Sequence, residues 1–243
     1  MRRLAPVGVG VLAAAAVGAC GGAGANNSDD AFGAKVRAYL LAHPEVVQEA
    51  AQRLQVKADA DEAAQEQKAR ADLPLLRGQI ERDPRDFVAN PAGKITVTEF
   101  YDYRCPHCAN AAPKVLALIA ADPDVRFVFK EMPIFGATSQ RAARAALAVK
   151  KAGGDYLGVY RTLMATHPLD DIAIDRIALA KGAKAADIAV NRAADAQLAD
   201  TTALFTKLSL GGTPAFIVGD EIVYGEDMEA LANAIAKAKG RGA

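Results

Sequence analysis

The sequence predicts an α/β domain that follows a separate helical segment. Two runs rich in β-branched and aromatic residues, 94–100 and 125–131, flank a helical stretch and therefore predict a βαβ unit with parallel strands. A long helical insertion follows, at about residues 137–210. Residues 215–225 have the pattern of a hairpin with a short turn, and a last helix follows them. The predicted order is βαβ, helical insertion, ββα.

Length and charge narrow the class of protein. The chain has 243 residues, which fits one domain of roughly 150 residues with additional segments. A domain of that size buries enough apolar surface to fold without disulfide staples. The formal net charge is +0, so nothing in the composition attracts nucleic acid, and we expect no nucleic-acid partner.

Residues 1–25 are typical of an export signal. Arg2 and Arg3 precede an apolar stretch, residues 6–19, that is too short to span a bilayer. We therefore expect the mature chain to lie outside the cytoplasm, in the periplasm, where disulfides persist.

Two processing sites compete within this signal. Ala23-Gly24-Ala25 fits the A-x-A cleavage pattern, which would release a soluble protein. Val17–Cys20 resembles a bacterial lipoprotein signal, in which Cys20 would be lipidated and anchor the chain to a membrane. Both readings stay open, and both place the protein outside the cytoplasm.

Residues 26–88 are expected to form a helical region ahead of the α/β domain, which spans residues 89–243. Val47 and Leu54 share one face of a predicted helix. Residues 58–71 have no core-facing apolar stripe, which is typical of a helix that is solvated or packs on other chains. Pro74 is expected to interrupt this helix. The sequence pattern alone leaves both readings of this region open.

The stretch Cys105-Pro106-His107-Cys108 is the strongest chemical signal in the chain. Pro106 is favoured at the first position of a helix, so Cys105 should lie at a helix N-terminus. Free N–H groups and the helix dipole stabilise a thiolate there, and a protonated His107 adds positive charge. A lowered pKa stabilises the reduced form and makes the disulfide a stronger oxidant. Cys108, one turn deeper, is expected to be less exposed and to act as the resolving thiol.

Other uses of two cysteines at this spacing fit less well. A c-type haem site needs histidine directly after the second cysteine, where this chain has Ala109. A structural zinc site needs four ligands. The remaining histidines, His43 and His167, lie far from the cysteine pair in the sequence, so this reading fits less well. Two soft thiolates, Cys105 and Cys108, can bind Cu(I), and this alternative stays open beside the redox reading. No organic cofactor is expected.

With a second motif, the element order resembles a known family. Thr213-Pro214 stands just before the predicted hairpin. The chain thus has the element order of a thioredoxin: a strand, Cys-x-x-Cys, a helix and, later, Thr-Pro before a hairpin strand. Over Ile95–Lys239 the chain resembles the DsbA family of exported thiol-disulfide oxidoreductases, whose motif is Cys-Pro-His-Cys. The resemblance implies a thioredoxin fold with a DsbA-like helical insertion. It also implies a cis Pro214 beside Cys105, which leaves the Thr213 backbone free to bind an extended substrate peptide.

The same resemblance assigns a role to Glu99. DsbA proteins keep a buried acidic residue six positions before the first cysteine, and Glu99 occupies that position. It implies that Glu99 relays the proton of Cys108, as a desolvated carboxyl with a raised pKa. The alternative is an exposed strand position. Lys130 is a candidate ion-pair partner for Glu99.

Residues 38–55 are similar to the segment ahead of the catalytic domain in the suppressor-of-copper-sensitivity C proteins. These proteins are DsbA-like, and that segment forms oligomers, trimers in known members. The resemblance implies a disulfide isomerase or reductase that acts on protein substrates with cysteines or disulfides and depends on a membrane redox partner. A DsbA-type dithiol oxidase and a Cu(I)-binding copper-tolerance protein are the alternatives.

Overall fold

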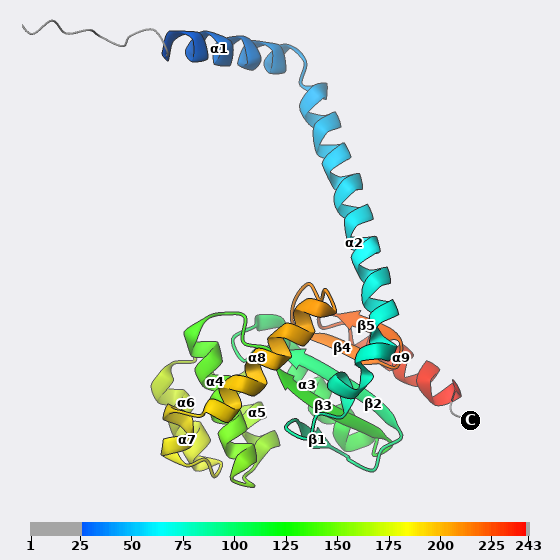
Figure 1. Ribbon diagram of the computed structural model, residues 1–243, viewed down its shortest axis with the longest axis vertical. Helices are drawn as coiled ribbons and strands as arrows, with labels where there is room; N and C mark the ends of the chain where they lie inside the picture. Colours follow the sequence, from blue (N-terminus) through cyan, green and yellow to red (C-terminus); the bar gives the residue numbers. More distant parts are fainter. Residues whose placement is uncertain (1–25, 242–243) are drawn as a thin grey trace, which may run out of the picture. The chain divides into compact units, whose positions relative to one another are not determined.

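The computed structural model describes residues 26–241 (Figure 1). Within that range, five strands form one sheet with the order β1-β3-β2-β4-β5. The strands are β1 (Phe87–Ala89), β2 (Ile95–Tyr101), β3 (Val125–Glu131), β4 (Ala215–Val218) and β5 (Glu221–Tyr224). The helices are α1 (Asn26–Ala42), α2 (Glu45–Glu81), α3 (Pro106–Ala121), α4 (Ala137–Lys151), α5 (Tyr156–Ala165), α6 (Asp171–Ala180), α7 (Ala185–Ala189), α8 (Arg192–Lys207) and α9 (Met228–Arg241).

The predicted βαβ unit and hairpin are confirmed. Strands β2 and β3 pair in parallel with α3 between them in sequence, and β4 pairs antiparallel with β2 and with β5. The sequence analysis missed β1, a three-residue strand that pairs antiparallel with β3. A strand that short has no alternating pattern of its own, so its pairing with β3 defines it. The insertion, α4 to α8, lies between β3 and β4 in sequence. Helices α4 to α7 gather beside the sheet, and α8 packs against one of its faces (Figure 1).

The two faces of the sheet carry different helices. One core cluster includes Val97 and Tyr101 of β2 together with residues of α3, α5 and α9. A second cluster joins Phe100 of β2 to the end of α2 and to α8. Neighbouring residues of a strand point to opposite faces, so β2 serves both cores. The cysteine pair follows the end of β2 and belongs to the same core cluster as Tyr101.

Helix α2 runs from Glu45 to Glu81 without a break, so the interruption expected at Pro74 is wrong. Proline removes one backbone hydrogen bond and costs a helix interior about 3 kcal/mol. Leu73, Leu76 and Ile80, each at most 2% exposed, pack into the second core cluster and offset that cost. Ala69, 1% exposed in the same cluster, is the one buried residue within 58–71, so the core-facing stripe of α2 begins at the end of that stretch and lies mainly after it.

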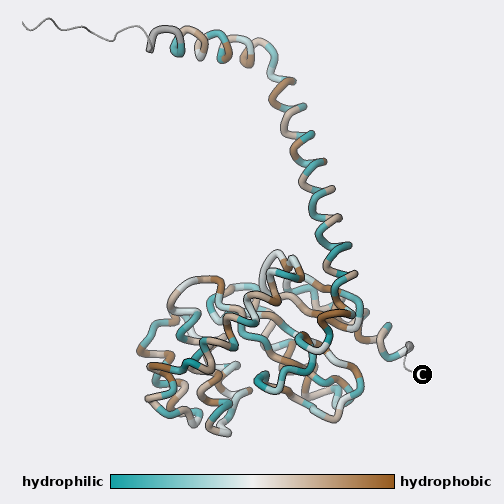
Figure 2. Tube along the Cα trace, viewed as in Figure 1, coloured by the Kyte–Doolittle hydropathy of each residue, from teal (hydrophilic) through white to brown (hydrophobic). Residues whose placement is uncertain are grey.

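The chain divides into two compact units between Asp59 and Ala60, inside α2 and well before residue 88. In the described part of the first unit, apolar residues recur along α1 and the start of α2 (Figure 2). Residues 1–25, with the predicted signal and Cys20, lie outside the described residues. Among the helices of residues 26–241, none is long and apolar enough to cross a membrane.

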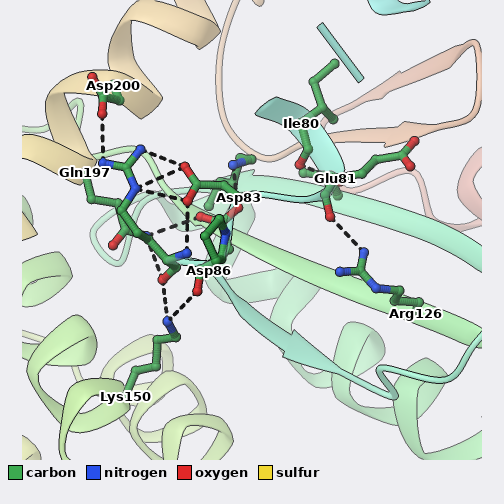
Figure 3. A network of polar contacts seen from close by, with 12 residues as sticks. Ile80, Glu81, Asp83, Asp86, Arg126, Lys150, Gln197 and Asp200 are labelled. Atoms are coloured by element: carbon green, nitrogen blue, oxygen red, sulfur yellow. Dashed lines mark hydrogen bonds and ion pairs between the residues drawn. The ribbon is translucent and has the colours of Figure 1, made fainter. Parts of the chain in front are cut away.

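A buried ion pair ties the segment after α2 to the sheet. Lys130 Nζ lies 2.5 Å from Asp86 Oδ2, and their side chains are 2% and 1% exposed. Gln197 of α8 donates to Asp86 and to the Arg85 carbonyl, and Lys150 of α4 donates to that carbonyl (Figure 3). The network connects two insertion helices to the start of the sheet.

The pairing of Lys130 with Glu99, considered from the sequence, is therefore wrong. In the β2–β3 register Lys130 stands opposite Phe100, and Glu99 stands opposite Phe129. Residues one position apart in a sheet point to opposite faces. Lys130 thus shares the face of Phe100 and meets Asp86, whereas Glu99 points to the face of α3 and α5.

We expect Lys130→Met to lower the free energy of unfolding by about 3–5 kcal/mol, because it leaves the Asp86 carboxylate buried without its cation. The double variant D86L/K130M removes both charges and should recover much of that loss. Lys151→Met, which breaks an exposed pair with Asp187, is the control and should change little. Urea unfolding measures all three. Equal losses in the single and double variants would contradict this account.

Candidate active site

Cys105 lies at the N-terminus of α3, as its sequence context predicts. The helix begins at Pro106, and Cys105 itself is extended, with φ −74° and ψ 120°. Cys105 is 3% exposed and Cys108 is 0% exposed, so the second cysteine is the more deeply buried of the two. Both are free cysteines.

The surroundings of Cys105 favour the thiolate and lower its pKa to about 5. The largest cause is a hydrogen bond from Cys108; burial acts in the opposite direction. The nearby Thr213 side chain and the backbone N–H groups of Cys108 and His107 lower the pKa further. The helix N-terminus therefore contributes as expected, but the neighbouring thiol contributes more. Reactivity that depends on the thiolate should be lost as pH falls through about 5.

Cys108 behaves in the opposite way. Burial raises its pKa well above that of an ordinary thiol, and its hydrogen bond to Cys105 and the charge of Glu99 act in the same direction. At neutral pH the pair thus consists of a thiolate at Cys105 and a thiol at Cys108. Cys108 can attack only after a base has taken its proton.

The Thr213–Pro214 peptide bond is cis, as the resemblance implied. It lies beside the cysteine pair, because Cys105 Sγ is 3.1 Å from the Thr213 carbonyl oxygen. Thr213 Oγ1 is buried and has no hydrogen-bond partner among the described residues. The Gly225 amide donates to the Pro214 carbonyl at 2.8 Å, which connects this loop to the end of β5.

The side chain of His107 points to a residue that the sequence analysis missed. His107 Nδ1 lies 3.0 Å from Glu226 Oε1, and Asn110 Nδ2 lies 3.4 Å from the same oxygen. Glu226 is the largest cause that raises the pKa of His107, and the charge of Cys105 raises it as well. Glu226 is distant in sequence, and only the return of the chain after β5 brings it to the cysteine pair, so no local pattern could identify it.

Glu99 is completely buried, which excludes the exposed alternative. Burial raises its pKa to about 8, and a hydrogen bond from Tyr160 lowers it in part. Tyr160 Oη lies 3.3 Å from Glu99 Oε1 and 3.2 Å from Oε2. Glu99 also raises the pKa of Cys108, so the two groups act on each other. A carboxyl that titrates near neutral pH beside a buried thiol can exchange a proton with it. Tyr160 was not identified from the sequence.

Asp102 fixes the loop that leads to the cysteines. Its carboxylate accepts hydrogen bonds from the backbone amides of Arg104, Ile134 and Phe135, at 2.7, 2.7 and 3.0 Å. The Ser139 hydroxyl donates to it at 2.8 Å. Arg104 Nη1 also donates to the Phe135 carbonyl at 2.8 Å, so the arginine braces this loop. Asp102 thereby joins the loops that follow β2 and β3.

Cys108→Ala should raise the pKa of Cys105 by about one unit or more, because it removes the largest hydrogen bond to the thiolate. Cys108→Ser keeps a donor at that position and should raise it less. The ultraviolet absorbance of the thiolate, followed against pH, measures both variants. An equal change in the two would show that the Cys108 hydrogen bond is not the main cause.

Glu226→Gln should lower the pKa of His107 toward its ordinary value, because the carboxylate that favours the charged ring is gone. Glu229→Gln removes the same charge three residues further along and serves as the matched control. The imidazole proton resonances, followed by NMR in the oxidised protein, report the titration. A fall of the same size in both variants would assign the effect to general charge instead of the His107–Glu226 contact.

Two family models match the chain. The DSBA-like thioredoxin domain matches residues 96–236. The N-terminal domain of the copper resistance protein ScsC matches residues 30–60. The two matches fall on the α/β domain and on the segment that contains α1 and the start of α2.

Solved structures agree with both matches. A thioredoxin-like oxidoreductase from Silicibacter pomeroyi is 37% identical, with a TM-score of 0.62, over 68% of this chain and 98% of that one. ScsC of Proteus mirabilis in a transitional conformation is 27% identical, with a TM-score of 0.64, over 88% of this chain and 98% of that one.

Among curated proteins, the Na(+)/H(+) antiporter NhaA 3 of Salinispora tropica is 31% identical over 194 residues. That match covers 70% of this chain and 28% of the antiporter, so the chain spans little more than a quarter of the length of this relative. The thioredoxin-domain model covers more than half of the chain, including both cysteines and the cis-proline loop. The chain therefore belongs to the DSBA-like thioredoxin domain family.

Proposed function

We propose that this protein is an exported thiol-disulfide oxidoreductase that isomerises or reduces disulfides in secreted proteins. The observation that carries the proposal is the asymmetry of the cysteine pair. Cys105 has a pKa lowered to about 5 and lies 3.1 Å from the Thr213 carbonyl beside the cis-proline, whereas burial keeps the proton on Cys108. This arrangement supplies one nucleophile and one resolving thiol.

In the proposed reaction, the Cys105 thiolate attacks one sulfur of a substrate disulfide. The substrate S–S bond breaks, its other sulfur leaves as a thiolate, and a mixed disulfide with Cys105 forms. In isomerisation, a substrate thiolate attacks the mixed disulfide and releases Cys105, so no net oxidation occurs. The low pKa of Cys105 makes it a good leaving group for this step.

In reduction, Cys108 gives its proton to Glu99 and attacks Cys105 Sγ. The bond between Cys105 and the substrate breaks, and the substrate leaves with both sulfurs reduced. Two electrons have then passed to the substrate, and Cys105 and Cys108 form a disulfide. Another round needs a dithiol donor, and we propose a membrane redox partner for this role.

The first unit supports an oligomer. Phe32, Val36 and Leu41 are 69%, 40% and 66% exposed. With Leu40 and Val47 they line an apolar groove of about 680 Å³ within that unit. Exposed apolar surface on helices is typical of an interface between chains. With the match to the ScsC N-terminal domain, it supports a homo-oligomer, and we propose a trimer.

Two alternatives remain proposals. A dithiol oxidase would use the same residues with the electrons flowing in the opposite direction. Thr213 before the cis-proline resembles isomerase-like members more than the oxidase DsbA. A copper-tolerance protein would bind Cu(I) through Cys105 and Cys108, two soft ligands that suit a low-coordinate Cu(I) ion. No cluster of three or more candidate ligands occurs in the part of the chain that the structure describes.

The double variant F32E/L41E tests the isomerase proposal on the full chain. Buried charges should prevent association, so we expect light scattering to give monomers. Reduction of a small disulfide should persist, because the cysteine pair lies in the other unit. Refolding of a protein with scrambled disulfides should fall at least tenfold.

Ile172→Glu is the control, since Ile172 is 81% exposed on α6 of the second unit. It should leave both association and refolding as they are. A wild-type chain that is already monomeric, or a monomeric variant that refolds scrambled protein at the normal rate, would rule out the oligomeric isomerase. Net oxidation of reduced substrates by the wild type would favour the oxidase.

A further inference from the structure

Helix α5 of the insertion presents two buried tyrosines one turn apart to two buried carboxyls. Tyr160 donates to Glu99. Tyr156 donates to Glu131 and also contacts the hydroxyl of Tyr101 at 2.8 Å. Residues four apart share one helix face, and Glu99 and Glu131 lie on the neighbouring strands β2 and β3. The insertion thus contacts the side of the sheet that carries the cysteine pair through two tyrosine hydroxyls, and only Tyr160 bonds to the carboxyl of Glu99.

The surroundings of Glu99 contain few groups that could control its charge. The charge of Glu99 raises the pKa of three titratable neighbours: Cys108 from α3, Tyr160 from α5 and Tyr103 from the loop after β2. The flanking strands place Phe129 and Phe216 opposite Glu99. Every hydrogen bond recorded for the Glu99 carboxyl among the described residues comes from Tyr160.

Lys130, the nearest lysine on β3, points to the other face and pairs with Asp86. The carboxylate form of Glu99 is therefore stabilised by one neutral hydroxyl. A buried carboxylate without a donor loses the full benefit of hydrogen bonding, whereas the neutral acid loses much less. The Tyr160 hydroxyl consequently favours the ionised form.

We propose that Tyr160 is a positioning residue for the resolving step: its hydroxyl orients the Glu99 carboxyl and increases the share of the ionised form, which accepts the Cys108 proton. This inference rests on the proposed function. The Cys108 proton moves to a Glu99 oxygen, and the Cys108 sulfur forms a bond with Cys105 Sγ. The bond between Cys105 and the substrate sulfur breaks, and that sulfur leaves as a thiolate with the electron pair of the broken bond.

The sign of the effect follows from this geometry. Without the Tyr160 hydroxyl, Glu99 binds its proton more tightly, and its carboxylate is scarcer at neutral pH. The resolving step then needs a higher pH. Attack by Cys105 does not use Glu99, so its pH dependence stays unchanged.

Tyr160→Phe on the full chain tests the inference, with Tyr156→Phe as the matched control. Each variant removes one buried hydroxyl from the same face of α5. The substrate is a chromogenic aromatic disulfide, which releases one thiol when Cys105 attacks and a second when Cys108 resolves the mixed disulfide. In Y160F we expect the pH midpoint of the second release to rise by about one unit, with a rate about tenfold lower below the midpoint. The first release should not change, and Y156F should leave both midpoints in place.

A background without the carboxyl separates positioning from a general structural effect. In Glu99→Gln, adding Tyr160→Phe should not alter the second release any further. Should Y160F fail to fold, fluorotyrosine in place of tyrosine throughout the chain supplies a stronger donor, which should lower the midpoint in the wild type and not in Glu99→Gln. If the pH midpoint of the second release does not change in Y160F, or if it changes equally in Y156F, the inference about Tyr160 is wrong and the proposed function still stands. Absence of both releases in the wild type overturns the proposed function.

Discussion

The proposed chemistry of this protein depends on the difference in proton affinity between the two neighbouring sulfurs of Cys105 and Cys108. Cys108 donates to Cys105, and this bond is the largest cause of the lowered pKa at Cys105 and one of the causes of the raised pKa at Cys108. The backbone N–H groups at the start of α3 lower the pKa of Cys105 further, and burial raises the pKa of Cys108. One contact therefore favours the thiolate at the first cysteine and the thiol at the second. In the proposed reaction the second cysteine needs a base, and Glu99 is the residue proposed for that role.

The two faces of the sheet separate Glu99, the proposed base, from the permanent charge of Lys130. Glu99 and Lys130 lie on adjacent strands, but the register sends them to opposite faces. On one face Lys130 meets Asp86 and secures the chain that follows α2. On the other, Glu99 meets a thiol and a tyrosine and keeps a pKa of about 8. Had the lysine shared the face of Glu99, the carboxyl would ionise far more readily and could not return a proton near neutral pH.

Local signals allowed the sequence to predict the βαβ unit, the hairpin, the cysteines at a helix N-terminus and, by resemblance, the cis Pro214. Each of these features has a pattern of neighbouring residues that indicates it. Glu226, Tyr160 and Asp86 were missed because their roles arise from contacts across many residues of sequence. Pro74 was misread for a related reason: tertiary packing of Leu73 and Ile80 overrides a local preference against helix.

The Thr213 hydroxyl is another buried polar group beside the cysteine pair. It is buried without a hydrogen-bond partner among the described residues, an arrangement that costs about 1–3 kcal/mol in a resting protein. The backbone carbonyl of the same residue lies 3.1 Å from Cys105 Sγ, and the Thr213 side chain is one of the groups that lower the pKa of Cys105. Because Cys105 is already a thiolate at neutral pH, the Thr213 side chain favours that resting anion, and the cost of burying its hydroxyl is offset by this contribution to the lowered pKa of Cys105.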